Sequence, residues 1–491
     1  MTTRQAAVAS SRGPAFVTLG CVALACAAVA AVLAQAGANG LIVAAGALAI
    51  AAVLVLARRR TAALLVLLVL SLQFLFHKSF GPVNTEIHSG ANAIFINNIS
   101  ALLVVLYALW IVEGDAVRDI RLAVRRPMFW IPLAAIALAL PSVLFAQDLY
   151  LAVAELIRML AMYLLFVCVA LRLRSRDDVL AVVGALFVVA ATQAVVATLQ
   201  WKTGSSLGLE LLGEQDTLGV RMLDDGSVDR PSGTVVHPIF LAALVAPIGM
   251  IALALSFDAA RAVWRRVSLA AAGVAFLPLI LAQARASLIA AACAVAALVA
   301  CSLATRRLRW TPVLVALLIS GTIGLLFAEE IGNRIEENFA TDHFETEVEA
   351  RVQLNDVALA MIADHPLAGV GLNNFETVEP EYDRYGLLFA GNPVHNIYLL
   401  VAAETGVLGL IGFLATLGAV ALSAVRAARA RDRALRAIGA GIAASLLFFL
   451  VEELLSFALR QEMPLALFWI LAGVAVAIAR IDRAAGDAGV A

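Results

Sequence analysis

Residues 395–424 have the sequence HNIYLLVAAETGVLGLIGFLATLGAVALSA, in which Glu404 is the only acidic or basic side chain apart from the first histidine. The hydrocarbon core of a bilayer, roughly 30 Å thick, is crossed by about 20 apolar residues in helical conformation. The stretch therefore predicts a transmembrane helix. Polar residues in such helices are usually functional, so the histidine and asparagine that open this one are candidates for a site.

The rest of the chain also has the composition of a membrane protein. Of its 491 residues, 63% are hydrophobic and 14% are charged, whereas a soluble domain is roughly half apolar and a quarter charged. A net charge of −1 gives no reason to expect a nucleic-acid partner. Apolar runs predict an all-α polytopic membrane protein with about 12–14 transmembrane helices. The runs are 15–35, 40–57, 61–76, 93–112, 128–146, 151–171, 179–200, 237–257, 267–283, 286–304, 311–328, 395–424, 437–458 and 464–479.

The distribution of charge predicts the orientation. Most of the 35 lysines and arginines fall on one side of the membrane when the runs alternate in direction. Such an excess marks the cytoplasmic side, so both termini are expected in the cytoplasm. All six histidines then fall on or near the outer side. The first run exceeds the roughly 7–15 residues of a signal-peptide core, which favours an uncleaved anchor over a signal peptide.

Two long outer segments divide the chain. The predicted parts are N-terminal helices over 1–200, a first periplasmic loop over 201–236, helices over 237–328, a large periplasmic loop over 329–394 and C-terminal helices over 395–491. In the large loop, Val348, Val352, Leu359 and Ile362 share one helical face, which predicts an amphipathic helix on the outer membrane surface. Pro366 ends it. The five cysteines lie within apolar runs and the acidic run 342–349 has no ligand spacing, so no metal site is predicted.

Two arginines near the membrane are candidates for chemistry. Arg285 lies between two apolar runs, where a charge costs roughly 2.5–3.5 kcal/mol at a helix centre and so indicates function. The alternative is an outer turn whose arginine reaches the surface. Arg230 opens RPSG, where a loop meets the membrane, and its alternative is a solvated loop arginine.

Carboxylates in the apolar runs have other interpretations. Glu155 and Arg158 are three residues apart on one helical face, which favours a structural ion pair. Glu452 and Glu453 have two possible roles. They could bind a cation or a hydroxyl, or one of them could pair with Arg460.

His395 has the most suggestive surroundings. The preceding Asn-Pro-Val predicts a turn that delivers it to a helix start, with Asn396 in the first turn. Gly406, Gly409 and Gly412 would let another helix approach closely. A neutral histidine with a reference pKa near 6.5 accepts and returns a proton at ambient pH. A histidine that is merely hydrogen-bonded at a helix interface is the alternative.

The spacing from His395-Asn396 over nine residues to Gly406, and over two more to Gly409, resembles the H[NSQ]x9GxxG motif of the bacterial O-antigen ligase and polymerase superfamily. Three further stretches resemble other blocks of that family, in the family's order, so the likeness covers roughly 220–425. They are RPSGTVVHP (230–238), ARASLIA (284–290) and DHPLAGVGLNNF (364–375). The chain has HPIF where relatives often have asparagine after His-Pro.

The resemblance implies a metal-independent glycosyltransferase of GT-C type, without a cofactor, in the bacterial inner membrane. It would move a glycan from undecaprenyl diphosphate to an acceptor on the periplasmic face. By similarity, His395 would be the base or hydrogen-bond partner for the acceptor hydroxyl, and Arg230 and Arg285 would hold the diphosphate. Further candidates for contacts to the diphosphate or acceptor are Arg351, Asn396, Glu404 and His237. The acceptor would be lipid A-core for a ligase, another lipid-linked repeat for an O-antigen or exopolysaccharide polymerase, and a protein hydroxyl for a glycosylase.

Two other classes of protein stay open. A transporter or flippase of lipid-linked glycan would also need charges in the membrane, but would spread them along a path to the cytoplasmic half. Their clustering on the outer side favours an enzyme. A structural membrane subunit would not need Arg230, Arg285 and His395 together.

Overall fold

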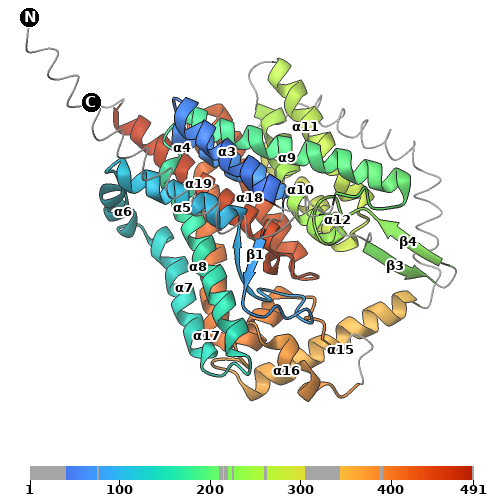
Figure 1. Cartoon of the computed structure of the whole chain (residues 1–491). Helices are drawn as coiled ribbons and strands as arrows, with labels where there is room; N and C mark the ends of the chain where they lie inside the picture. Colours follow the sequence, from blue (N-terminus) through green and yellow to red (C-terminus); the bar gives the residue numbers. More distant parts are fainter. Residues whose placement is uncertain are drawn as a thin grey trace, which may run out of the picture.

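The structure is a computed structural model that describes residues 40–74, 77–209, 214, 219–223, 226–258, 262–304, 343–385 and 391–488 (Figure 1). The predicted runs 15–35 and 311–328 lie outside these residues. In chain order the elements are α3 (Gly40–Leu56), α4 (Arg60–Leu70), η2 (Ser71–Gln73), β1 (His77–Phe80), β2 (Ile94–Asn97), α5 (Asn98–Val112), α6 (Ala116–Val124), α7 (Pro127–Val143), α8 (Leu149–Arg172), α9 (Arg176–Thr203), β3 (Gly219–Leu223), β4 (Gly226–Arg230), α10 (Pro238–Asp258), α11 (Ala262–Leu281), α12 (Arg285–Ala304), α15 (His343–Asp364), α16 (Phe375–Tyr382), α17 (Ile397–Ala427), α18 (Arg433–Glu452), η4 (Ala458–Arg460) and α19 (Glu462–Ala488).

The predicted all-α polytopic membrane fold is confirmed. Eight of the described helices are long and apolar enough to cross a membrane, namely α8 to α12 and α17 to α19. Shorter apolar helices cover Arg60–Gln73, Asn98–Val112 and Pro127–Val143. Each predicted run within the described residues overlaps a helix, because hydropathy over a spanning length is a local property of the sequence.

Helix α10 forms the centre of the bundle. It packs against α9, α11, α12, α18 and α19, and almost all of its side chains are buried. Small residues allow this close packing, as at Gly441 of α18, where a Cβ would press on the Ile251 backbone. Polar residues define helix ends elsewhere. Ser175 and Asp178 form a capping box that starts α9, and Gly204 ends that helix in a left-handed conformation.

One end of the bundle carries an array of ion pairs. Arg174 contacts Asp115 at 2.7 Å and Asp119 at 2.8 Å, and Arg436 contacts Asp258 at 2.7 Å. These pairs join the ends of α6, α8, α10 and α18. They lie at the end that the charge pattern predicts to be cytoplasmic, and this orientation stays a prediction.

The opposite end has elements that the apolar runs did not reveal. Strands β1 and β2 pair antiparallel, from His77 opposite Asn97 to Phe80 opposite Ile94, and β3 pairs with β4 in a second hairpin. Helices α15 and α16 lie together at the bottom of Figure 1. Strand β2 lies at the start of the predicted run 93–112, and the other short elements have polar or mixed sequence, which carries no spanning signal.

The helix predicted in the large loop is present as α15, and the placement of its predicted apolar face on the membrane surface stays a prediction. Leu354, Val357 and Met361 are buried against α16 and α17, whereas Val352 and Leu359 are 52% and 51% exposed. The sequence contains two apolar faces, and only the packing of α15 on α16 decides which one is buried.

A candidate active site at one end of the bundle

The site is built around the start of α17. Asn396 is its N-cap, since its side chain accepts hydrogen bonds from the backbone N–H groups of Tyr398 and Leu399 at 3.0 and 3.2 Å. The sequence placed Asn396 in the first turn, but the helix begins one residue later. His395 therefore directly precedes a capped helix start, and the capping bonds fix the backbone from which its ring projects.

A cavity of about 630 Å³ opens beside His395. Its walls come from the β1–β2 hairpin and its loop, from α5 and α8, from the segment that leads into α10, and from the start of α19. This volume falls in the usual range for ligand pockets, about 300–1,000 Å³. The polar side chains among its described lining residues are His77, Ser79, His88, Asn92, Asn97, Ser100, Arg158, His237, Asn392, His395, Ser456, Gln461 and Glu462.

A row of four rings forms one wall of the cavity. The His395 and Phe457 centroids are 5.2 Å apart, those of Phe457 and Phe240 are 6.0 Å apart, and those of Phe240 and His237 are 5.5 Å apart. The first two contacts are edge-to-face, a favourable arrangement for aromatic quadrupoles. The row holds the two histidines on the same wall.

His237 is held as a neutral hydrogen-bond donor. Its Nδ1 accepts the backbone N–H of Ile239 at 3.2 Å, so the ring proton resides on Nε2. Burial lowers the pKa of His237 to about 4, and the nearby charges of Arg230 and His395 act in the same direction. The structure thus brings Arg230, at the end of β4, into the neighbourhood of the cavity.

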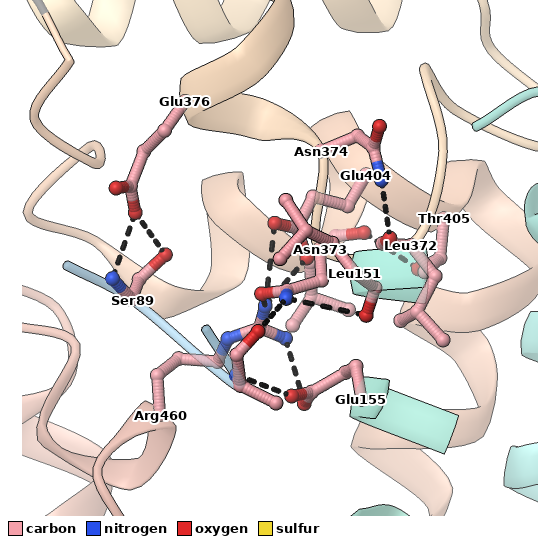
Figure 2. Close-up of polar contacts among 12 residues, drawn as sticks. Ser89, Leu151, Glu155, Leu372, Asn373, Asn374, Glu376, Glu404, Thr405 and Arg460 are labelled. Atoms are coloured by element: carbon pink, nitrogen blue, oxygen red, sulfur yellow. Dashed lines mark hydrogen bonds and ion pairs between the residues drawn. The ribbon is translucent and has the colours of Figure 1, made fainter. Parts of the chain in front are cut away.

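The hairpin loop is fastened to α16 through Glu376. The Ser89 backbone N–H and Oγ donate to Glu376 Oε1 at 2.7 and 2.6 Å, and the His88 N–H donates to Oε2 at 2.5 Å (Figure 2 shows the Ser89 contacts). The His88 ring lies 3.2 Å from the Gly391 carbonyl, and Glu376 raises the pKa of His88. The loop, α16 and the segment that leads to His395 therefore share one set of contacts.

A buried charge cluster adjoins the cavity through Arg158, and Figure 2 shows its members Glu155, Glu404 and Arg460. The predicted ion pair of Glu155 and Arg158 is present at 2.7 Å. Arg460 contacts Glu404 at 3.0 Å and Glu155 at 3.4 Å. Pairing of Arg460 with Glu452 or Glu453 was among the predicted alternatives, and Arg460 contacts other carboxylates instead.

The adjacent carboxylates at the end of α18 have different partners. Glu452 accepts a hydrogen bond from Ser287 Oγ at 2.9 Å, and Glu453 accepts one from the Leu459 backbone N–H at 2.7 Å. Both side chains are buried.

The predicted site residues are distributed around the cavity rather than gathered in it. His395 and His237 line it, Arg230 lies near His237, and Arg351 donates to the Leu455 carbonyl at 3.4 Å, two residues before Phe457. Arg285 begins α12 and is not among the described lining residues. Asn396 caps α17, and Glu404 is 1% exposed and faces a second, smaller cavity.

The second cavity, about 130 Å³, lies between α7, α8, α17 and α19. Its lining is mostly apolar, with Ile136, Phe413 and Trp469 among its walls. Arg158 and Met162 line both cavities, so the two cavities adjoin at α8.

Sequence reasoning missed the contribution of the first hairpin. His77, His88 and Asn97 line the cavity, yet they lie far from every recognised motif. The signal was available in residues 77–98, HKSFGPVNTEIHSGANAIFINN, a stretch that contains two histidines and four asparagines.

Fold and site together define a multi-pass membrane protein with a cavity of apolar and polar lining residues at one end of its helices. Residues 270–414 match the family model described as O-antigen ligase. This match confirms the relationship to the O-antigen ligase and polymerase superfamily, and it indicates a membrane enzyme of that type. The matched segment includes α12, α15, α16 and His395. Comparison with curated proteins gave no match.

Proposed function

We propose that this protein is a metal-independent, inverting glycosyltransferase of the inner membrane. It transfers a glycan from undecaprenyl diphosphate to an acceptor hydroxyl on the periplasmic face. The observation that carries the proposal is the position of His395 on the wall of the 630 Å³ cavity, within the segment that matches O-antigen ligase. The cavity lies at the end of the helices opposite the ion-pair array, as the charge pattern requires for an outer site.

In the proposed reaction, His395 accepts the proton of the acceptor hydroxyl as its oxygen attacks the anomeric carbon. The new C–O bond forms on the face opposite the diphosphate while the bond to the diphosphate oxygen breaks, so the configuration inverts. The electron pair leaves with the diphosphate. A base at hydrogen-bond distance contributes typically about 10²–10⁴-fold. The donor is already activated, so the reaction needs no nucleotide.

Cations around the cavity suit the leaving group. Guanidinium forks match phosphate oxygens, and fixed charges stabilise the negative charge that develops on the diphosphate. Arg230 is close to His237, and Arg351 reaches the chain just before Phe457. Arg285 stands at the N-terminal end of α12, where the helix dipole also favours an anion. The neutral His237 offers an Nε2–H to a sugar or phosphate oxygen.

The smaller cavity suits the lipid part of the donor. It is more apolar than the large cavity, which it adjoins at Arg158 and Met162. We assign the first carbons of the polyprenyl chain to it and the diphosphate to the polar side. Such an arrangement keeps the hydrocarbon out of water while the sugar reaches His395.

The test is the surface-glycan profile of a deletion strain that expresses wild type, His395→Ala or His365→Ala. His365 is an exposed histidine of the same loop and is the matched control. We expect wild type and His365→Ala to restore the profile and His395→Ala to fail at equal protein level. A wild-type profile with His395→Ala would refute the assignment of the base.

The profile of the deletion strain also identifies the acceptor. A single repeat left on lipid A-core indicates a polymerase, whereas polymer that accumulates on the lipid carrier indicates a ligase. A change confined to glycoproteins indicates a protein glycosylase. Release of undecaprenyl diphosphate by the purified protein distinguishes all three from a flippase, which breaks no sugar-phosphate bond.

A further inference from the structure

Helix α17 is broken at Gly406, and a loop from the preceding segment fills the break. Gly406 has φ 62° and ψ −166° within an otherwise helical run. Such a break deprives neighbouring backbone groups of their helical partners. The loop supplies new ones, since the Val407 N–H donates to the Pro366 carbonyl at 2.8 Å, and the Gly371 N–H donates to the Glu404 carbonyl at 3.1 Å.

The fit of loop and helix leaves no room for side chains. A Cβ on Gly406 would overlap the Leu367 backbone, and a Cβ on Gly369 would overlap the Glu404 backbone. Both glycines have positive φ, 62° and 70°, which disfavours other residues on its own. The helix and the loop therefore each need a glycine where they meet.

The Glu404 side chain links the contact between the loop and the α17 break to the wall of the large cavity. Its carboxylate contacts Arg460 at 3.0 Å, and Arg460 Nη2 also donates to Asn373 Oδ1 at 2.8 Å (Figure 2). Asn373 Nδ2 in turn donates at 2.7 Å to the carbonyl of Ala91, which lines the large cavity. Glu404 is 1% exposed and is not among the described residues that line that cavity.

The other end of the same helical segment is also held from outside α17. The Ile397 N–H donates to the Glu453 carbonyl at 3.0 Å, and Tyr398 Oη donates to the Leu450 carbonyl at 3.0 Å. Residues 397–405 thus form a short helix that is anchored at both ends by groups outside α17. His395 extends from its first end.

We propose that Glu404, Arg460 and Gly406 are positioning residues that set the orientation of residues 397–405 and so place His395 in the cavity. The inference rests on the proposed function. It assigns Glu404 a positioning role that acts through Arg460, without contact between Glu404 and the substrate. It also gives the nine-residue spacing a physical meaning, because the histidine and the break mark the two ends of one rigid segment, about 14 Å long at 1.5 Å per residue.

A double substitution separates positioning from folding. The cluster of Glu155, Arg158, Glu404 and Arg460 contains two charges of each sign. Glu404→Gln or Arg460→Gln alone leaves one buried charge in excess, which destabilises the fold. The double variant Glu404→Gln/Arg460→Gln restores neutrality but lacks the charged link between the α17 break and Asn373.

The experiment uses the full-length protein in nanodiscs, with lipid-linked glycan extracted from the deletion strain as donor. Turnover, the half-saturating donor concentration and thermal unfolding are measured. We expect each single variant to unfold at lower temperature and the double variant to recover most of that loss. Turnover of the double variant should fall at least tenfold, while its half-saturating donor concentration stays within twofold of wild type.

Two results would overturn the inference. Wild-type turnover in the double variant would show that the cluster does not position His395. A change confined to the half-saturating concentration would show that Glu404 or Arg460 binds the donor. His395→Ala and wild type, measured in parallel, separate the two proposals. Wild-type turnover in His395→Ala would refute His395 as the base, and no turnover in wild type would reject the proposed function itself.

A second variant covers the case in which the double variant does not fold. Asn373 has φ 58°, a conformation that glycine adopts readily, so Asn373→Gly removes the amide contacts without strain or change of charge. We expect turnover to fall with the half-saturating concentration unchanged. Unchanged turnover would contradict the inference independently of the charge cluster.

Discussion

The ring of His395 meets the ring of Phe457 edge-to-face, with centroids 5.2 Å apart and planes at 78°. Phe457 also contacts Phe240, which in turn contacts His237. One phenylalanine thus links the proposed base to a wall that includes the second histidine. Because Phe457 has no polar atom, its contribution to transfer would be to hold the imidazole and shape the sugar site.

Phe457→Leu is therefore expected to slow transfer without abolishing it. An aromatic pair is worth about 0.5–1.5 kcal/mol beyond its buried area, which corresponds to a loss of roughly two- to tenfold. Turnover of purified protein measures the effect, and Phe145→Leu is the control because Phe145 is 59% exposed. Equal turnover in both variants would show that the edge contact does not matter for catalysis.

His237 predicts a specific acid dependence of stability. Its folded pKa of about 4 lies below the unfolded value near 6.5, so the folded state favours the neutral ring. This contribution to stability is present above pH 6.5 and is lost as pH falls towards 4. We expect the unfolding temperature to fall less steeply over this range in His237→Asn than in wild type. Parallel curves for the two proteins would contradict a buried neutral His237.

His88 predicts the opposite dependence at the hairpin loop. Glu376 raises the pKa of His88, so the protonated ring is favoured in the folded state. The contact of His88 with Glu376 is fully present below the unfolded pKa and is lost as pH rises through the folded one. Hydrogen exchange of residues 375–385 should therefore quicken with rising pH, after correction for intrinsic rates, more in wild type than in His88→Asn. An identical response in both proteins would show that protonation of His88 does not stabilise this contact.

Whether a feature could be predicted from the sequence depends on how far apart in the chain its interacting residues lie. The apolar helices and the His395 motif depend on residues close in sequence, and they were found. Contacts between distant residues were not. Ser89 and Glu376 are 287 residues apart, and Arg460 had candidate carboxylates nearby in sequence yet contacts Glu155 and Glu404. The buried face of α15 likewise depended on its packing against α16, which its own periodicity does not encode.

The glycines of α17 differ in a way that one pair of substitutions tests. Gly406 and Gly418 lie in the same helix, but Gly418 has open space around its Cβ position, whereas Gly406 meets the Leu367 backbone at positive φ. Strain of that kind costs on the order of 1–3 kcal/mol before any displacement of the loop, so Gly406→Ala should lower the unfolding temperature by several degrees. Gly418→Ala replaces a glycine in the helix interior with a residue of higher helix propensity, so it should be neutral or slightly stabilising. Thermal unfolding in nanodiscs compares them directly. Similar unfolding temperatures for the two variants would mean that the break at Gly406 is not required for the fold, and that the loop can leave the helix at little cost.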